Sequence, residues 1–219
     1  MPYKLTTDQI NKLISQPETG MGYQYVEAKM SNYSSFKGVV LNGEVFIPDI
    51  RVEKIMGFRS LNYSAILNEA EQAGQVRDLK VISKGQLHLG EKFFAKSAKA
   101  PASEAPITET KEDEVFKRYS PYRNDRRVTS DGGLLPGTYT TTEEDSHNVK
   151  TGKEAMDRYA LPSDDPAIYV FTIQPPEKTR VRVGIVEPAN NKPGGGVEVI
   201  FEDGSPRKTV TGLDTIPAE

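Results

Sequence analysis

The sequence contains no cysteine, no tryptophan and only two histidines. The lack of cysteine excludes disulfide bonds, thiolate metal sites and cysteine nucleophiles. The histidines, His88 and His147, lie far apart in the chain and lack the spacing of metal ligands. We therefore expect a protein that works without a bound metal ion.

The sequence also lacks a long hydrophobic run. Its N-terminal segment, MPYKLTTDQINKLIS, has no apolar signal region, and no segment approaches the length of a membrane span. The formal net charge of -3 gives no basic surplus of the kind that nucleic-acid-binding domains show. We expect no membrane span and no nucleic-acid partner, and a location in the cytoplasm or export by a route without a signal peptide.

A break in composition near the middle of the chain predicts its domain organisation. Residues 95–114, AKSAKAPASEAPITETKEDE, are nearly free of large apolar side chains, so they bury too little surface to offset their ordering entropy. We interpret them as a flexible linker between a small α+β unit, residues 1–94, and a second domain, residues 115–219. A long loop within a single domain is the alternative.

The first unit shows clear helix and hairpin signals but no catalytic constellation. Thr6 and Gln9 fit a capping box, which predicts a helix that ends before Pro17. Asn42-Gly43 predicts the turn of a hairpin over residues 36–47. Further elements are expected as a strand at 23–30, a helix at 60–74 and extended segments at 78–83 and 85–94. The function of this unit is not indicated.

The second domain is predicted to be compact and rich in strands. Thr151 and Glu154 fit another capping box, at the start of a helix over residues 151–162. Hydrophobic patterns predict strands at 167–175, 179–188, 196–204 and, as an edge strand, 208–216. The fold class is therefore α+β.

Three consecutive glycines, Gly194, Gly195 and Gly196, come directly before the strand that carries Glu198. Such a run indicates backbone that must come close to another strand or to a ligand. Alternation along the strand places Glu198 on the same face as Ile200. Glu198 is then either a solvated side chain on an edge strand or a carboxylate that faces a cleft.

RYALP (158–162), VGIVEP (183–188) and PGGGVEV (193–199), in this order and spacing, resemble the tuberculosis necrotizing toxin (TNT) type of NAD glycohydrolase domain. The resemblance covers roughly residues 120–219. It implies a fold related to ADP-ribosyltransferases and NAD as the substrate. It also implies a toxin or effector, with the N-terminal unit serving delivery or regulation or binding an immunity or carrier protein.

The resemblance and the chemistry of NAD cleavage together suggest site residues. Cleavage of the bond between nicotinamide and ribose passes through an oxocarbenium-like state, which the carboxylate of Glu198 would stabilise. Tyr139 would stack on the nicotinamide ring, and Arg127 would complete the catalytic set. The ligand-binding candidates are Arg126, Thr138, Gly194, Gly195 and Gly196. Residues 125–145 begin with a short strand candidate, and its register leaves open which of Arg126 and Arg127 faces the cleft.

Two departures from the family pattern leave alternatives open. Glu198 stands where the family has glutamine, and residues 189–192 read ANNK where the family has an aromatic-Gly-Gln run. Glutamate is the usual catalytic residue of the wider ADP-ribosyltransferase group, so hydrolysis and ADP-ribosyl transfer are both expected possibilities. A protein-interaction module without turnover and an assembly protein are the non-enzymatic alternatives.

Overall fold

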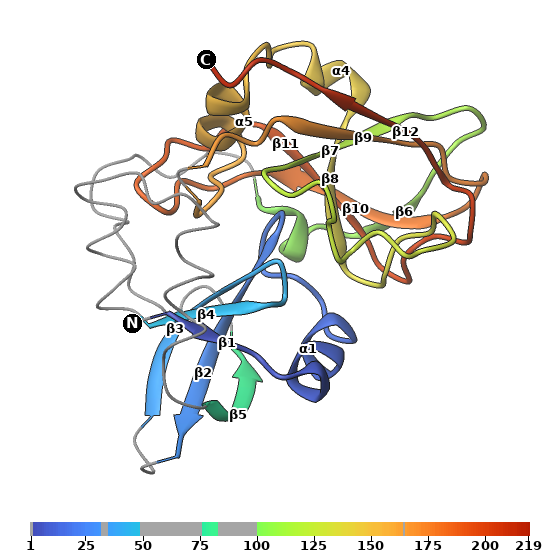
Figure 1. Cartoon of the computed structure of the whole chain (residues 1–219). Helices are drawn as coiled ribbons and strands as arrows, with labels where there is room; N and C mark the ends of the chain where they lie inside the picture. The colour runs from blue at the N-terminus through green and yellow to red at the C-terminus, as the bar shows by residue number, and fades with distance from the viewer. Residues whose placement is uncertain (1, 32–34, 49–75, 83–99, 164) are drawn as a thin grey trace.

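The computed structural model describes residues 2–31, 35–48, 76–82, 100–163 and 165–219. In this part the chain forms an α+β fold with two antiparallel sheets (Figure 1). The helix predicted at 60–74 and the extended segment predicted at 85–94 lie outside the described residues.

The N-terminal unit is a five-stranded sheet with one helix beside it. Its strand order is β1-β4-β3-β2-β5, and every neighbouring pair is antiparallel. The elements are β1 Tyr3–Lys4, α1 Thr7–Ile14, β2 Tyr23–Met30, β3 Ser35–Leu41, β4 Val45–Pro48 and β5 Val76–Val81.

Local signals in this unit are confirmed. The Thr6 side chain accepts the amide of Gln9, and the Gln9 side chain accepts the amide of Thr6, so the capping box starts α1 as predicted. Ile10 and Leu13 of α1 are buried against the sheet. Asn42 and Gly43 both adopt positive φ, 49° and 65°, as a tight hairpin turn requires.

The C-terminal unit is a seven-stranded sheet of order β12-β9-β7-β8-β11-β10-β6, with short helices near one end (Figure 1). Its strands are β6 Ile107–Glu109, β7 Phe116–Ser120, β8 Thr138–Thr142, β9 Tyr169–Ile173, β10 Arg180–Ile185, β11 Val197–Phe201 and β12 Val210–Thr215. The helices are the 3-10 turn η3 Ala102–Glu104, α4 Glu143–Ser146 and α5 Gly152–Arg158. The capping box of Thr151 and Glu154 is confirmed at α5, and β12 is an edge strand as predicted.

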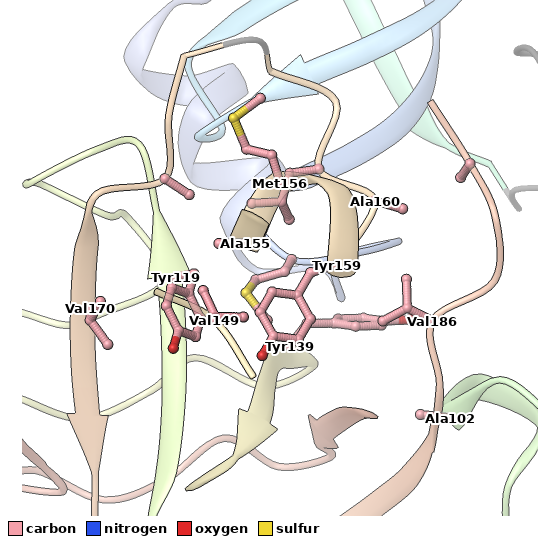
Figure 2. Packing of buried hydrophobic residues seen from close by; sticks show 14 of the residues in the cluster. Ala102, Tyr119, Tyr139, Val149, Ala155, Met156, Tyr159, Ala160, Val170 and Val186 are labelled. Atoms are coloured by element: carbon pink, nitrogen blue, oxygen red, sulfur yellow. The ribbon is translucent and has the colours of Figure 1, made fainter. Parts of the chain in front are cut away.

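Both faces of the C-terminal sheet are covered. Along β11, Val199 and Phe201 join one buried cluster, whereas Ile200 joins the other. The cluster that contains Ile200 also contains Tyr139 of β8, Met156 of α5 and Tyr159 at the end of α5. Figure 2 shows Tyr139, Met156 and Tyr159 within this packing. Glu198 shares this face with Ile200, because alternate residues of a strand point the same way.

The linker prediction needs correction over residues 100–114. Ala102 is fully buried, and Ile107–Glu109 pair with β10 as an edge strand of the C-terminal sheet. The composition of this segment misleads because ladder hydrogen bonds need backbone groups, not large apolar side chains. The backbone of Pro101 and Ala102 also packs where a Cβ on Gly184 would lie. Residues 95–99 lie outside the described part.

Candidate functional site

Glu198 lies in the interior of the C-terminal sheet and not on an edge. It is the second residue of β11, between β8 and β10, and it is only 9% exposed. Its partner on β10 is Gly184, whose missing side chain leaves room for the backbone of Ala102. The Ala102 amide donates a hydrogen bond of 2.8 Å to Oε1 of Glu198. A glycine on one strand thus allows a backbone donor to fix the carboxylate on the next.

The charge of Glu198 affects the pKa of two tyrosines. Tyr139 is on β8, where it is the register partner of Ile200, and Tyr23 is on β2 of the N-terminal unit. Burial, and after it the negative charge of Glu198, raises the pKa of Tyr139 well above its ordinary value. The same two causes raise the pKa of Tyr23. Both phenols therefore stay protonated at neutral pH.

The three glycines make a close backbone contact with the end of α5. The Gly194 and Gly196 amides donate to the carbonyls of Asp157 and Arg158, at 3.0 and 3.1 Å, and the Gly195 amide donates to the Val186 carbonyl at 2.8 Å. A Cβ on Gly196 would lie 2.7 Å from the Tyr159 ring. These amides are engaged within the chain, which differs from the expectation that they face a ligand. The run lets β11 begin directly against the helix end.

A buried polar cluster holds α5 in place next to this contact. Asp145 accepts hydrogen bonds from Arg158 Nε at 2.9 Å and from the Tyr159 hydroxyl at 3.1 Å. The Tyr159 ring stacks on Tyr119 of β7 with centroids 5.3 Å apart. Arg158 is thus a structural residue whose partner is Asp145, and the cluster fixes the helix end that receives the glycines.

Arg127 contacts the N-terminal unit. Its Nη1 donates to the carbonyls of Ile14 and Gln16, at 2.9 and 3.0 Å, where α1 ends. Its Nε donates to Thr138 Oγ1 at 3.2 Å. Arg127 is only 5% exposed, and burial lowers its pKa. Arg127 therefore joins the two units, and Thr138 contacts its guanidinium from within the C-terminal unit.

Arg126 also faces the N-terminal unit. Its guanidinium lies 3.5 Å from the Glu44 carboxylate, and its backbone amide donates to Asn42 Oδ1 at 3.0 Å. A narrow cavity between the units is lined partly by Arg118, Arg126, Arg127 and Glu18. The two candidate arginines therefore lie together at this cavity.

The sequence interpretation missed Arg118, the most buried charged residue in the described part of the chain. Arg118 is 0% exposed. Its guanidinium donates to both carboxylate oxygens of Glu18 at 2.9 Å and to those of Asp125 at 3.0 and 3.1 Å. Its partner Glu18 is 100 residues away in sequence, so no local spacing could have indicated the pair.

Glu18 and Arg118 replace part of the ladder between β7 and β8. These strands pair only at Phe116↔Thr142 and Lys117↔Thr141. Beyond this point the Tyr139 amide donates to Glu18 Oε2 at 3.0 Å, and the Tyr139 carbonyl accepts Arg118 Nη1 at 2.7 Å. A side chain from the N-terminal unit is therefore inserted where the two strands separate.

The described residues contain no group of three or more histidine, cysteine, aspartate and glutamate side chains that could hold a metal ion. Within the same residues, no helix is both long and apolar enough to cross a membrane.

No protein-family model matches the sequence, and no curated protein matches it. A chain of a solved structure, "Structure of Tne2 in complex with Tni2", is similar to 56% of this chain and 98% of its own length, with 15% identity and a TM-score of 0.40. The family resemblance of the sequence therefore stays a proposal.

Proposed function

We propose that the C-terminal unit is an NAD-consuming enzyme, an NAD glycohydrolase that acts as a toxin or effector. The observation that carries this proposal is the buried Glu198 carboxylate, held by the Ala102 amide on the same sheet face as Tyr139. A carboxylate in a site of low dielectric stabilises a developing positive charge more strongly than one in water. Glu198 would stabilise the oxocarbenium-like state that forms as nicotinamide leaves.

The other candidate residues have supporting roles in this proposal. Tyr139, buried near Glu198, would stack on the nicotinamide ring. Arg126 and Arg127 would contact the pyrophosphate once their bonds to the N-terminal unit are released, and Thr138 would offer its hydroxyl beside them. The glycine run would shape the site by fixing the start of β11 against α5.

Transfer of ADP-ribose to a protein is the second enzymatic possibility, because Glu198 is glutamate and not the glutamine of the family that the sequence resembles. Hydrolysis releases free ADP-ribose, whereas transfer leaves it bound to an acceptor. The products therefore separate the two reactions.

A non-enzymatic interaction module is favoured by a different observation. Arg126, Arg127 and Tyr139 all lie next to side chains or backbone of the N-terminal unit. A permanently covered face would bind no NAD, and the outer surface of the protein would then contact an immunity or carrier protein.

The test is NAD consumption by the purified full chain and by its Glu198→Ala variant. Glu202→Ala is the matched control, because Glu202 follows β11 and pairs with Arg182 at 2.8 Å. We expect Glu198→Ala to lower the rate by at least about 100-fold, the scale of losing one electrostatic stabiliser, and Glu202→Ala to leave it unchanged. Equal NAD loss by the wild type and by a folded Glu198→Ala variant would contradict the assignment.

A further inference from the structure

We propose that residues 17–25 form an intramolecular plug that closes the Glu198 site, and that Glu18 locks this plug in place. The inference rests on the proposed function in one respect, that the closed site is the one assigned to NAD. It adds a regulatory step, since NAD would enter only after the plug leaves.

The lock is the set of hydrogen bonds that the Glu18 carboxylate accepts. Besides both Arg118 Nη atoms, the carboxylate accepts the Tyr139 amide at 3.0 Å and the Gly22 amide at 2.9 Å. Arg118 and Arg127 carry positive charge there, and Glu18 and Asp125 balance it. These contacts lie where β7 and β8 separate, next to the strand that carries Tyr139.

The rest of the plug lies against the face that carries Glu198. Met21 is 4% exposed and belongs to the core cluster of the C-terminal unit, with Tyr139 and Ile200. The Tyr25 hydroxyl donates to Asn190 Oδ1 at 3.2 Å. After burial, the charge of Glu198 is the next cause of the raised pKa of Tyr23. One short segment of the N-terminal unit therefore packs against the residues that surround Glu198.

The fit between the plug and the C-terminal unit is close. A Cβ on Gly137, just before β8, would lie 2.5 Å from Pro17. Gly22 adopts a φ of 84°, a conformation that favours glycine and lets its amide reach Glu18. Such a surface excludes a dinucleotide while the plug is seated.

A buried ion pair suits a reversible closure better than an apolar contact. The pair gains little net stability over hydrophobic packing, but loss of one partner leaves a buried charge and weakens the closed state strongly. A competing anion or partner protein that takes Arg118 from Glu18 would therefore release the plug.

The test uses the absence of cysteine from the chain. A Met21→Cys variant of the full chain carries a single thiol, whose reaction rate with a maleimide reports plug opening. Adding Glu18→Gln should speed labelling by at least about 100-fold, with far-UV circular dichroism still native. Asp78→Asn is the control, because it removes a solvent-exposed ion pair with Lys12 and should leave the rate within about twofold.

Unchanged labelling after Glu18→Gln would overturn the plug, as would labelling that rises only in step with global unfolding. Tyr25→Phe is a second variant in case Glu18→Gln fails to fold. It removes only the hydroxyl bonded to Asn190 and should speed labelling about fivefold.

NAD consumption separates the plug from the proposed function. Faster labelling together with faster NAD loss in Glu18→Gln supports the plug as a regulator. Faster labelling with slower NAD loss would mean that the N-terminal segment completes the site, which overturns the regulatory inference. Faster labelling with no NAD loss in any variant would support the closure and overturn the proposed enzyme.

Discussion

Two buried glutamates, Glu18 and Glu198, show how different surroundings suit a carboxylate to different tasks. Glu18 faces a guanidinium and two backbone amides, so its charge is balanced within the lock. Glu198 accepts the Ala102 amide and lies near two phenols whose pKa it helps to raise. The first arrangement joins two parts of the chain.

The second arrangement places a carboxylate near two protonated phenols in a buried site, where the proposed reaction would gain most from a negative charge. Under the proposed function, Glu18 has a structural role and Glu198 a chemical one. The following changes are ordered from the largest expected effect to the smallest, and the last ones act at sites that contact neither glutamate.

Replacing Arg118 should have the largest effect on stability. Arg118→Met leaves Glu18 and Asp125 as buried carboxylates without their counter-charge, and we expect a loss of about 3–5 kcal/mol in the free energy of unfolding. Denaturant unfolding measures this loss. Arg180→Met is the control: its ion pair with Asp203 is half exposed, so a loss below about 1 kcal/mol is expected. Similar losses for both variants would refute the structural role of the lock.

A methyl group at Gly196 should disturb the start of β11, the strand that carries Glu198. Gly196→Ala places a Cβ 2.7 Å from Tyr159, and we expect a loss of about 1–3 kcal/mol as α5 moves away. At Gly212 the nearest atom is 3.5 Å from the added Cβ, so Gly212→Ala should change stability by less than about 0.5 kcal/mol. Thermal unfolding followed by circular dichroism compares the two, and equal melting temperatures would rule out the close contact.

The two capping boxes test whether the lock couples the units. Thr6→Ala in the N-terminal unit and Thr151→Ala in the C-terminal unit should each cost about 1 kcal/mol, because each removes the acceptor for a helix amide. If Glu18 and Arg127 join the units, both variants shift one common unfolding transition. Two separate transitions in calorimetry, each moved by only one variant, would show that the units unfold independently.

The smallest effect is expected at the exposed pair of Lys12 and Asp78. The hydrogen bond from Lys12 lowers the pKa of Asp78, so the pair stabilises the folded state above the unfolded pKa of about 4. This contribution disappears as the pH falls through the lower folded pKa. Asp78→Asn should therefore cost about 0.5 kcal/mol or less at about pH 7 and nothing at about pH 2. A cost that grows toward low pH would contradict the sign.

Elements with local signals were predictable from the sequence. Thr6 with Gln9, Thr151 with Glu154, and Asn42-Gly43 each act within a few residues, and each forms as expected. The prediction of a flexible linker was wrong over residues 100–114, because the burial of Ala102 depends on Gly184, which is distant in sequence.

The candidate site was predictable only in part. Alternation along the strand predicts that Glu198 shares a face with Ile200. The register that brings Tyr139 to this face, and the segment that covers it, do not follow from any local pattern. Glu18 is held by Arg118 and by the Tyr139 backbone amide. Both are distant in sequence from Glu18, and a single sequence gives no reason to pair them. The arginines Arg126 and Arg127 were singled out for their chemistry, but their partners in the N-terminal unit decide where they point.

The most direct test of the account is NAD consumption by a set of four full-length chains: wild type, Glu18→Gln, Glu198→Ala and the double variant. The account predicts that Glu18→Gln consumes NAD faster than wild type, and that the double variant is as inactive as Glu198→Ala. A double variant that keeps the activity of Glu18→Gln would contradict the chemical role of Glu198, and with it the distinction between the two glutamates.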